Sequence, residues 1–188
     1  MSAEVLEQAF ASTGSVLAGV TAKQMDDSTP CASWPVRALV NHIVGGTHFF
    51  AASATQGEEP PAGDPPDFTN GDFVAAFKDG AAQAVSAFAA DGTMEKMIKL
   101  SFAELPGSQF VFIAALDTFT HGWDLAKATG QSTDLNPELA GQLLEVARMS
   151  IPDAFRGPDG QAPFGPKVEM GASACPADEL AAFLGRQP

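Results

Sequence analysis

The stretch 109–128, QFVFIAALDTFTHGWDLAKA, decides the fold of this chain. It is strongly apolar, contains no Pro, and is bounded by Ser108, a candidate N-cap, and by Gly130, a typical helix stop. Its length and composition predict the most buried helix of the protein. Two of its polar residues, Asp117 and His121, therefore lie on a helix that we expect to pack in the core.

Further helices are predicted on both sides of this stretch. Helical spacing of apolar residues, together with caps and breakers, indicates them over residues 3–22, 33–54, 72–90, 136–150 and 177–184. In the second of these, Ser33 acts as the N-cap and Pro35 occupies the first turn. Residues 55–70 and 157–176 are rich in Gly and Pro and are expected to be irregular, and 94–102 forms a short strand or an extended connection. The pattern predicts an all-α fold.

Composition restricts the classes of function. The chain has 188 residues, 45% of them hydrophobic, which suits one compact domain over residues 1–188. The net charge of -13 opposes binding to nucleic acid and to anionic membrane surfaces. No leader-like segment opens the chain and no apolar run has the length of a membrane span, so we expect a cytoplasmic protein. In that compartment Cys31 and Cys175 are expected to be free thiols.

Candidate site residues gather around the three histidines of the chain, His42, His48 and His121. Asp117 and His121 are four residues apart, so they project from one helix face about one turn from each other and can chelate one ion. Asp124 returns close to the same stripe and could orient a ligand through a hydrogen bond. His42, on a neighbouring helix, is the natural third ligand.

Spacing alone leaves two interpretations of these residues open. A buried His beside an Asp is often a satisfied hydrogen-bonded pair, and Asp-x-x-x-His is a weak pattern for a metal site. His48 is a weaker ligand candidate than His42, because the residues between them turn its side chain about 120° away on an unbroken helix. A bend at Gly45-Gly46 would bring His48 back as a fourth ligand.

Several motifs of the chain resemble those of a known family. They are the stretch 29–46, TPCASWPVRALVNHIVGG, the stretch 121–130, HGWDLAKATG, and the shorter motifs at 156–158, 164–166 and 183–186. Together they resemble the actinobacterial metal-binding proteins related to the mycothiol-dependent maleylpyruvate isomerase N-terminal domain, within the DinB-like superfamily. The resemblance covers nearly the whole chain.

This resemblance implies an up-down four-helix bundle with short additional helices and an irregular C-terminal segment. It also implies a metal held at one end of the bundle by a His and a Glu-x-x-x-His pair, which fall here on His42, Asp117 and His121. Asp117 is a departure, because Asp reaches one methylene less far than Glu. Ala38 is another, since relatives often carry an acid there, so we predict no substrate contact from that segment. His and carboxylate ligands suit zinc, with nickel, cobalt and iron as chemical alternatives.

Three functions are compatible with such a site. The first is a metal-dependent thiol S-transferase or isomerase that uses mycothiol or a similar low-molecular-weight thiol as cosubstrate with an electrophilic substrate. The second is a metal-dependent hydrolase with Asp117 or Asp124 as base. The third is a non-catalytic metal-binding module whose site His48 closes. Arg37 and Arg148 are candidates for holding an anionic substrate group, and a homodimer is left open.

Overall fold

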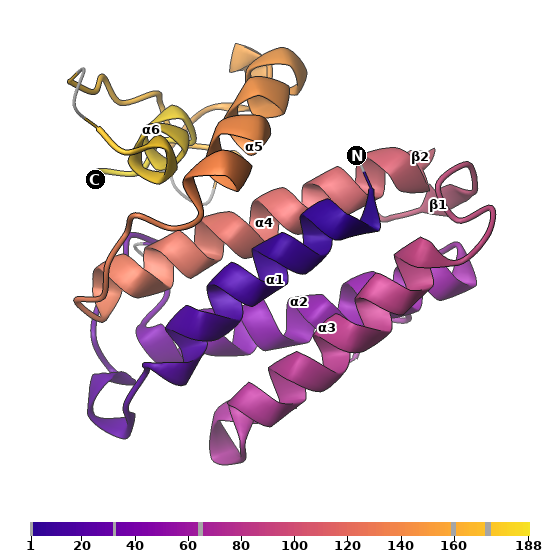
Figure 1. The fold of residues 1–188 in the computed structure, drawn as a ribbon, viewed down its shortest axis with the longest axis horizontal. Coiled ribbons are helices and arrows are strands. Elements are labelled where there is room, and N and C mark those ends of the chain that lie inside the picture. The colour runs from indigo at the N-terminus through magenta and orange to yellow at the C-terminus, as the bar shows by residue number, and fades with distance from the viewer. Residues whose placement is uncertain (1, 32, 64–65, 159–160, 172–173) are drawn as a thin grey trace.

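Helices dominate the computed structural model, which describes residues 2–31, 33–63, 66–158, 161–171 and 174–188 (Figure 1). The α-helices of these residues are α1 (Ala3–Ala18), α2 (Val36–Gln56), α3 (Phe73–Ala89), α4 (Gly107–Ala128), α5 (Pro137–Ser150) and α6 (Pro176–Phe183). Short 3-10 turns are η1 (Ala22–Gln24), η2 (Phe68–Asn70) and η3 (Asp153–Phe155). Each α-helix coincides with a predicted helix apart from shifts of a few residues at its ends.

The four long helices α1 to α4 lie side by side around the core (Figure 1). Both α1 and α2 pack on α3 and on α4, so the four helices close a ring. The core of the protein consists of fully buried side chains, among them Leu6, Leu17, Leu39, Phe88, Phe110, Phe119, Trp123 and Leu125. The helices α5 and α6 pack on each other and contact α4 from outside the ring. The up-down bundle of DinB-like proteins stays a prediction.

A small antiparallel sheet is an addition to the predicted all-α fold. Strand β1 (Met97–Lys99) pairs with β2 (Glu104–Pro106), with Ile98 opposite Leu105. The sequence pattern predicted a short strand or an extended connection over residues 94–102 and no strand at residues 104–106, where β2 lies. The two strands form because Ile98 and Leu105 are both buried where the hairpin packs against α4.

The predicted start of α2 is wrong by a few residues. The helix begins at Val36 with Pro35 at its N-cap, so Ser33 is not the capping residue. The first amide of α2 is satisfied by tertiary structure, because the Val36 N–H donates to the Asp27 carbonyl over 3.0 Å. A backbone carbonyl brought in by the preceding loop has replaced the side-chain cap.

The start of α4 differs from the prediction for the same reason. The helix begins at Gly107 with Pro106 at its N-cap, and Ser108 lies inside the first turn. The Gly107 N–H donates to the Lys96 carbonyl and the Ser108 N–H donates to the Met94 carbonyl, each over 2.9 Å. The segment that leads into β1 therefore caps α4.

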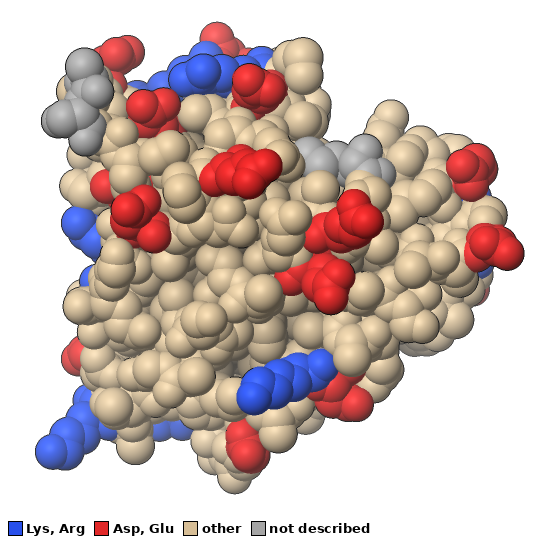
Figure 2. Space-filling model, in the orientation of Figure 1, with Lys and Arg blue, Asp and Glu red and all other residues tan. Residues whose placement is uncertain are grey.

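The surface reflects the acidic composition. Figure 2 shows acidic side chains scattered over one face of the molecule, with the basic side chains mostly toward its margins. Within the described residues, no helix combines the length and the apolar character needed to cross a membrane.

Candidate metal centre

The three predicted ligands meet between α2 and α4. The Nε2 atom of His42 lies 3.5 Å from Asp117 Oδ1, and the Nε2 atom of His121 lies 3.6 Å from the same oxygen. One ligand atom from each of these residues lies within 4.8 Å of those of the other two. The structure thus brings together the residues selected from the sequence, while their binding of a metal stays a prediction.

Helical spacing and the packing of two helices create this convergence. Asp117 and His121 are one turn apart on α4, so their side chains leave the same face of the helix. His42 comes from α2, which packs on α4. One turn further along α2, a Cβ atom on Gly46 would lie 4.0 Å from Asp117 Oδ2. This is an ordinary van der Waals distance, so Gly46 lies beside the carboxylate but the site does not require glycine there.

An indole ring lies against the two imidazoles. The Trp34 ring centroid is 4.7 Å from that of His42 and 5.7 Å from that of His121, and the two imidazole centroids are 4.6 Å apart. The side chains of His42, Asp117 and His121 nevertheless keep 35%, 30% and 12% of their exposed area. The cluster is covered on one side by Trp34 and remains partly exposed to solvent.

A second layer of polar groups lies behind His121. Its Nδ1 atom is 3.0 Å from Asp124 Oδ2, which is the contact predicted from the spacing. The same carboxylate accepts two hydrogen bonds from Arg186, and its Oδ2 atom accepts one from Cys31. Because Asp124 is fully buried and acts as an acceptor, Nδ1 of His121 carries the proton. Its Nε2 lone pair then faces Asp117.

Both aspartates of the site are held in the ionised form. Burial opposes the charge on Asp124, but the His121 ring and the Arg186 guanidinium hold its pKa at about 2. Burial also opposes the charge on Asp117, and the His121 and His42 rings, in their positively charged form, lower its pKa below the usual value. Two carboxylates therefore flank the His121 ring, an arrangement that favours a cation.

His42 and Cys31 have raised pKa values with different consequences. Burial disfavours the charged form of His42, but the Asp117 carboxylate, assisted by Asp124, raises its pKa above the usual value. Burial, followed by the charge of Asp124, raises the pKa of the Cys31 thiol to about 12. Cys31 is therefore a protonated hydrogen-bond donor and not a nucleophile. Its free state, and that of Cys175, confirms the prediction of free thiols.

The remaining candidates lie apart from the cluster. His48 stacks on Phe68 with ring centroids 5.5 Å apart, and it belongs to neither group of potential ligands among the described residues. The helix α2 is continuous through Gly45-Gly46, so the bend that would bring His48 to the site as a fourth ligand is absent. Arg37 donates a hydrogen bond to η2, and Arg148 is exposed on α5.

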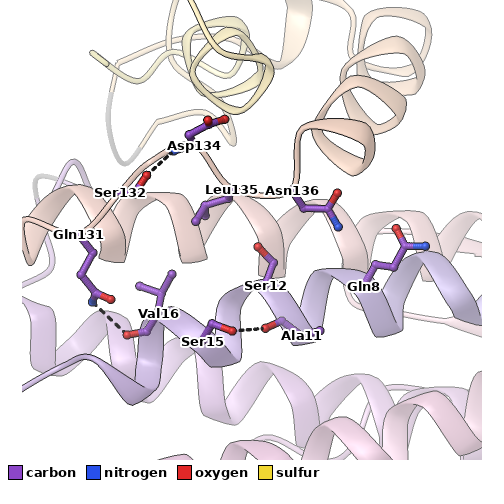
Figure 3. A pocket seen from close by; sticks show the side chains of 10 residues that line it. All are labelled: Gln8, Ala11, Ser12, Ser15, Val16, Gln131, Ser132, Asp134, Leu135 and Asn136. Atoms are coloured by element: carbon purple, nitrogen blue, oxygen red, sulfur yellow. Dashed lines mark hydrogen bonds between the residues drawn. The ribbon is translucent and has the colours of Figure 1, made fainter.

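A surface pocket of about 520 Å³ lies elsewhere, between α1 and the connection from α4 to α5 (Figure 3). Gln131 closes one end of it, where its Nε2 atom donates to the Val16 carbonyl over 3.0 Å. The pocket is lined by amides, hydroxyls and apolar groups, with Asp134 as its carboxylate and no His or Cys. It therefore lacks the ligand chemistry of the cluster between α2 and α4.

Arg186 is the residue of this region that sequence reasoning missed. It belongs to the motif 183–186, but helical spacing cannot connect the end of the chain to α4. One feature of the sequence could have indicated such a residue. Asp124 lies on a helix predicted to be buried, and a buried carboxylate needs a cationic partner. The chain offers ten Lys and Arg residues in all.

The fold and the site define a helical protein in which two imidazoles and a carboxylate from neighbouring helices converge beneath an indole ring. The family model of the mycothiol maleylpyruvate isomerase N-terminal domain matches residues 6–126. The chain belongs to this family, which confirms the resemblance seen in its motifs.

Relatives with similar sequences come from Mycobacterium tuberculosis. Two uncharacterized proteins, from strains CDC 1551 / Oshkosh and H37Rv, are each 44% identical to this chain over 180 residues. The alignment covers 96% of this chain and 93% of each relative, so the similarity extends through the C-terminal segment. No solved structure matches the chain.

Proposed function

We propose that His42, Asp117 and His121 bind one divalent metal ion, with zinc as the first choice and nickel, cobalt or iron as alternatives. The spacing of the donor atoms carries this proposal. Two ligands that each lie about 2.1 Å from a tetrahedral zinc ion are about 3.4 Å apart. The two His–Asp distances are 3.5 Å and 3.6 Å. Both exceed the ordinary hydrogen-bond length, so the donors converge without satisfying one another.

An unsatisfied buried atom supports the same proposal. His42 Nε2 is buried and has no hydrogen-bond partner among the described residues, a state that costs about 1–3 kcal/mol. A ligand-binding role would give this atom a partner. Asp117 has a shorter side chain than the Glu of the family pattern, but its carboxylate still reaches the site. Its Oδ1 atom lies near the Nε2 atoms of both imidazoles. The departure from the Glu-x-x-x-His pattern is therefore compatible with three protein ligands.

We further propose a metal-dependent enzyme that uses mycothiol or a similar low-molecular-weight thiol, of the S-transferase or isomerase type. Membership of the family supports the thiol. When bound, a metal with an open position lowers the pKa of a coordinated thiol or water. Asp124 would orient His121 in this site, Trp34 would wall it, and the exposed sides of His42 and Asp117 would admit the substrates.

Two alternatives are less well supported. In a hydrolase, Asp124 would have to act as a base, but it is fully buried and accepts hydrogen bonds from three side chains. Asp117 would itself be a ligand of the ion, so its carboxylate would not be free to act as a base. In a non-catalytic module closed by His48, that ring would have to leave its stack on Phe68.

The proposed thiol chemistry suits a reducing compartment. We therefore propose the cytoplasm as the location, in agreement with the two free cysteines. We also propose that the four long helices form an up-down bundle and that the chain acts as one domain. The contact between Arg186 and Asp124 supports a single domain, because it joins the C-terminal segment to α4, the helix that carries two of the proposed ligands.

Metal content tests the first proposal. Untagged protein is loaded with Zn²⁺, desalted and measured by elemental analysis, with His48→Ala as the matched control. We expect one equivalent of metal in the wild type and in His48→Ala, and loss of the metal in His42→Ala and in His121→Ala. Full occupancy in either of these last two variants, or none in the wild type, would contradict the proposal.

Substrate turnover tests the second proposal. The loaded protein is given an electrophile with and without mycothiol, and consumption of the electrophile is followed. We expect a rate that requires the thiol and disappears in His121→Ala. A rate that is independent of thiol and depends on the metal would instead support the hydrolase.

A further inference from the structure

The C-terminal segment reaches the back of the candidate metal centre through one side chain. Arg186 Nε donates to Asp124 Oδ1 over 3.2 Å, and Arg186 Nη2 donates to Asp124 Oδ2 over 3.0 Å. The guanidinium thus holds both carboxylate oxygens in a fork, the geometry of the strongest Arg–carboxylate pairs. The Arg186 side chain is 15% exposed and that of Asp124 is 0% exposed, so water and salt screen the pair little.

Two glycines build the turn that delivers Arg186. Gly185 follows α6 with a φ of 93°, a left-handed conformation that favours glycine. A Cβ atom on Gly185 would lie 2.5 Å from the Cα atom of Gly165, so the two backbones touch. Arg156 fixes the same region by donating to the Phe183 carbonyl over 2.7 Å and to the Gly165 carbonyl over 3.2 Å. Packing, and not the ion pair alone, sets the position of Arg186.

The layer behind His121 is not arranged as a second metal site. Ligand atoms of Cys31, His121 and Asp124 do lie within 4.8 Å of one another. However, Arg186 already engages both oxygens of Asp124, and the Cys31 thiol donates to Oδ2 over 3.2 Å. A metal ion would have to displace both a guanidinium and a proton. The guanidinium is therefore the cation of this layer.

We propose that Arg186 is a positioning residue of the metal centre. It holds the Asp124 carboxylate in the orientation that keeps the proton on Nδ1 of His121, over a contact of 3.0 Å, so that the Nε2 lone pair points at the ligand cluster. This inference rests on the proposed metal binding by that cluster. It assigns a role to a residue that lies outside the matched family region, residues 6–126.

The loss of Arg186 has a specific consequence for the ring. Asp124 would remain as a buried carboxylate without the fork that fixes its two oxygens, so it would no longer hold one orientation against Nδ1 of His121. The ring could then carry its proton on either nitrogen, and the tautomer protonated at Nε2 has no lone pair directed at the ligand cluster. The role of Arg186 is thus distinct from general support of the fold.

The first measurement is the affinity for Co²⁺, followed through its visible absorption, in Arg186→Gln and Arg186→Lys. We expect a loss of about 10- to 100-fold in Arg186→Gln, the usual effect of removing a group that orients a metal ligand. The loss in Arg186→Lys should be smaller, because Lys restores the charge but not the fork. Asp178→Ala is the control: it releases the same segment at Trp123, whose Nε1 donates to Asp178 over 2.8 Å, and should keep the wild-type affinity.

The second measurement needs no metal and separates this inference from the proposed function. Nitrogen NMR shifts of His121 in the metal-free protein should report Nδ1 as the protonated nitrogen in the wild type and in Asp178→Ala. In Arg186→Gln, the two nitrogen shifts should move toward each other, because the ring no longer keeps a single tautomer. If Arg186→Gln does not fold, Arg186→Lys is used for both measurements and should show the same changes in weaker form.

The outcomes are distinguishable. If the wild type binds no Co²⁺, the proposed function fails and the NMR shifts still test Arg186. If the wild type binds Co²⁺ and a folded Arg186 variant keeps the wild-type affinity and shifts, this inference is overturned while the proposed function stands. An equal loss of affinity in Asp178→Ala would also overturn it, because it would indicate a merely structural role.

Discussion

Near the start of α4, Phe110 packs against three aromatic rings, whereas near its end Asp124 is surrounded by a guanidinium, an imidazole and a thiol. The ring centroids of Phe49, Phe50 and Phe88 lie 6.2 Å, 5.7 Å and 5.6 Å from that of Phe110. Phe110 and Asp124 are both 0% exposed. One helix therefore buries an apolar cluster at one end and a charged network at the other.

The two ends contribute to the protein in different ways. Burial of Phe110 removes apolar surface from water and stabilises the fold directly. Burial of Asp124 has a desolvation cost that its partners offset, and such networks are often no more stabilising than an apolar replacement. We infer that the charged end is retained for its chemistry. Each of the following changes tests that division of labour.

The largest effect is expected from the aromatic end. Phe110→Ala leaves a cavity among three rings and should lower the free energy of unfolding by about 4 kcal/mol, measured by urea denaturation. Metal stoichiometry should persist below the unfolding transition. Phe102→Ala is the control, since Phe102 is 64% exposed and its removal should change little. Equal losses in the two variants would show that the aromatic cluster is not the stabilising end.

The next effect comes from breaking the charged network on one side only. Asp124→Ala leaves Arg186 without its buried counter-ion and should lower the free energy of unfolding by about 3 kcal/mol. The double variant Asp124→Leu, Arg186→Met should recover most of this stability in urea denaturation while losing metal affinity. A double variant as unstable as Asp124→Ala would mean that the network stabilises the fold in its own right.

Acid should remove the contribution of the charged end. The folded pKa of Asp124, about 2, lies below the value of about 3.9 of an unfolded Asp, so the unfolded state takes up the proton first. Stability from this group is complete above about pH 5 and should fall by about 2 kcal/mol as the pH drops toward 2. Denaturation of the metal-free wild type and of Asp124→Asn should show a smaller fall in the variant. Parallel pH profiles would contradict the assignment.

The smallest effect is expected from metal removal. Free Zn²⁺ at about ten times its dissociation constant should add about 1.4 kcal/mol to the free energy of unfolding, measured as a rise in melting temperature that a chelator reverses. His121→Ala should show no rise, and His48→Ala should show the full rise. A rise that survives in His121→Ala would place the metal elsewhere.

Helical periodicity predicted the ligand face of α4 because Asp117, His121 and Asp124 are local to one helix. His42 was proposed as the third ligand because a metal needs one and because the family resemblance agrees, since spacing does not determine which helices become neighbours. Arg186 was missed for that reason, because its contact with Asp124 depends on the turn at Gly185. The sequence therefore predicted the helices, the ligand face of α4 and the Asp124 contact behind His121, but not the contacts of Arg186 and Cys31 with Asp124.

The predicted caps failed for a related reason. Ser33 and Ser108 have side chains suited to capping, but α2 and α4 begin where backbone carbonyls of other segments accept their first amides. Local propensity cannot anticipate a partner supplied by tertiary structure. The second strand of the small sheet, β2, was missed in the same way.

These tertiary caps also bear on the order in which the protein forms. The first turns of α2 and α4 depend on carbonyls of Asp27 and Lys96, so they gain their partners only when the preceding loops have docked. In hydrogen exchange, the amides of Val36 and Gly107 should open together with those loops and before the middle turns of their helices. Since α2 and α4 carry all three proposed ligands, docking of the loops and assembly of the site become parts of one cooperative event.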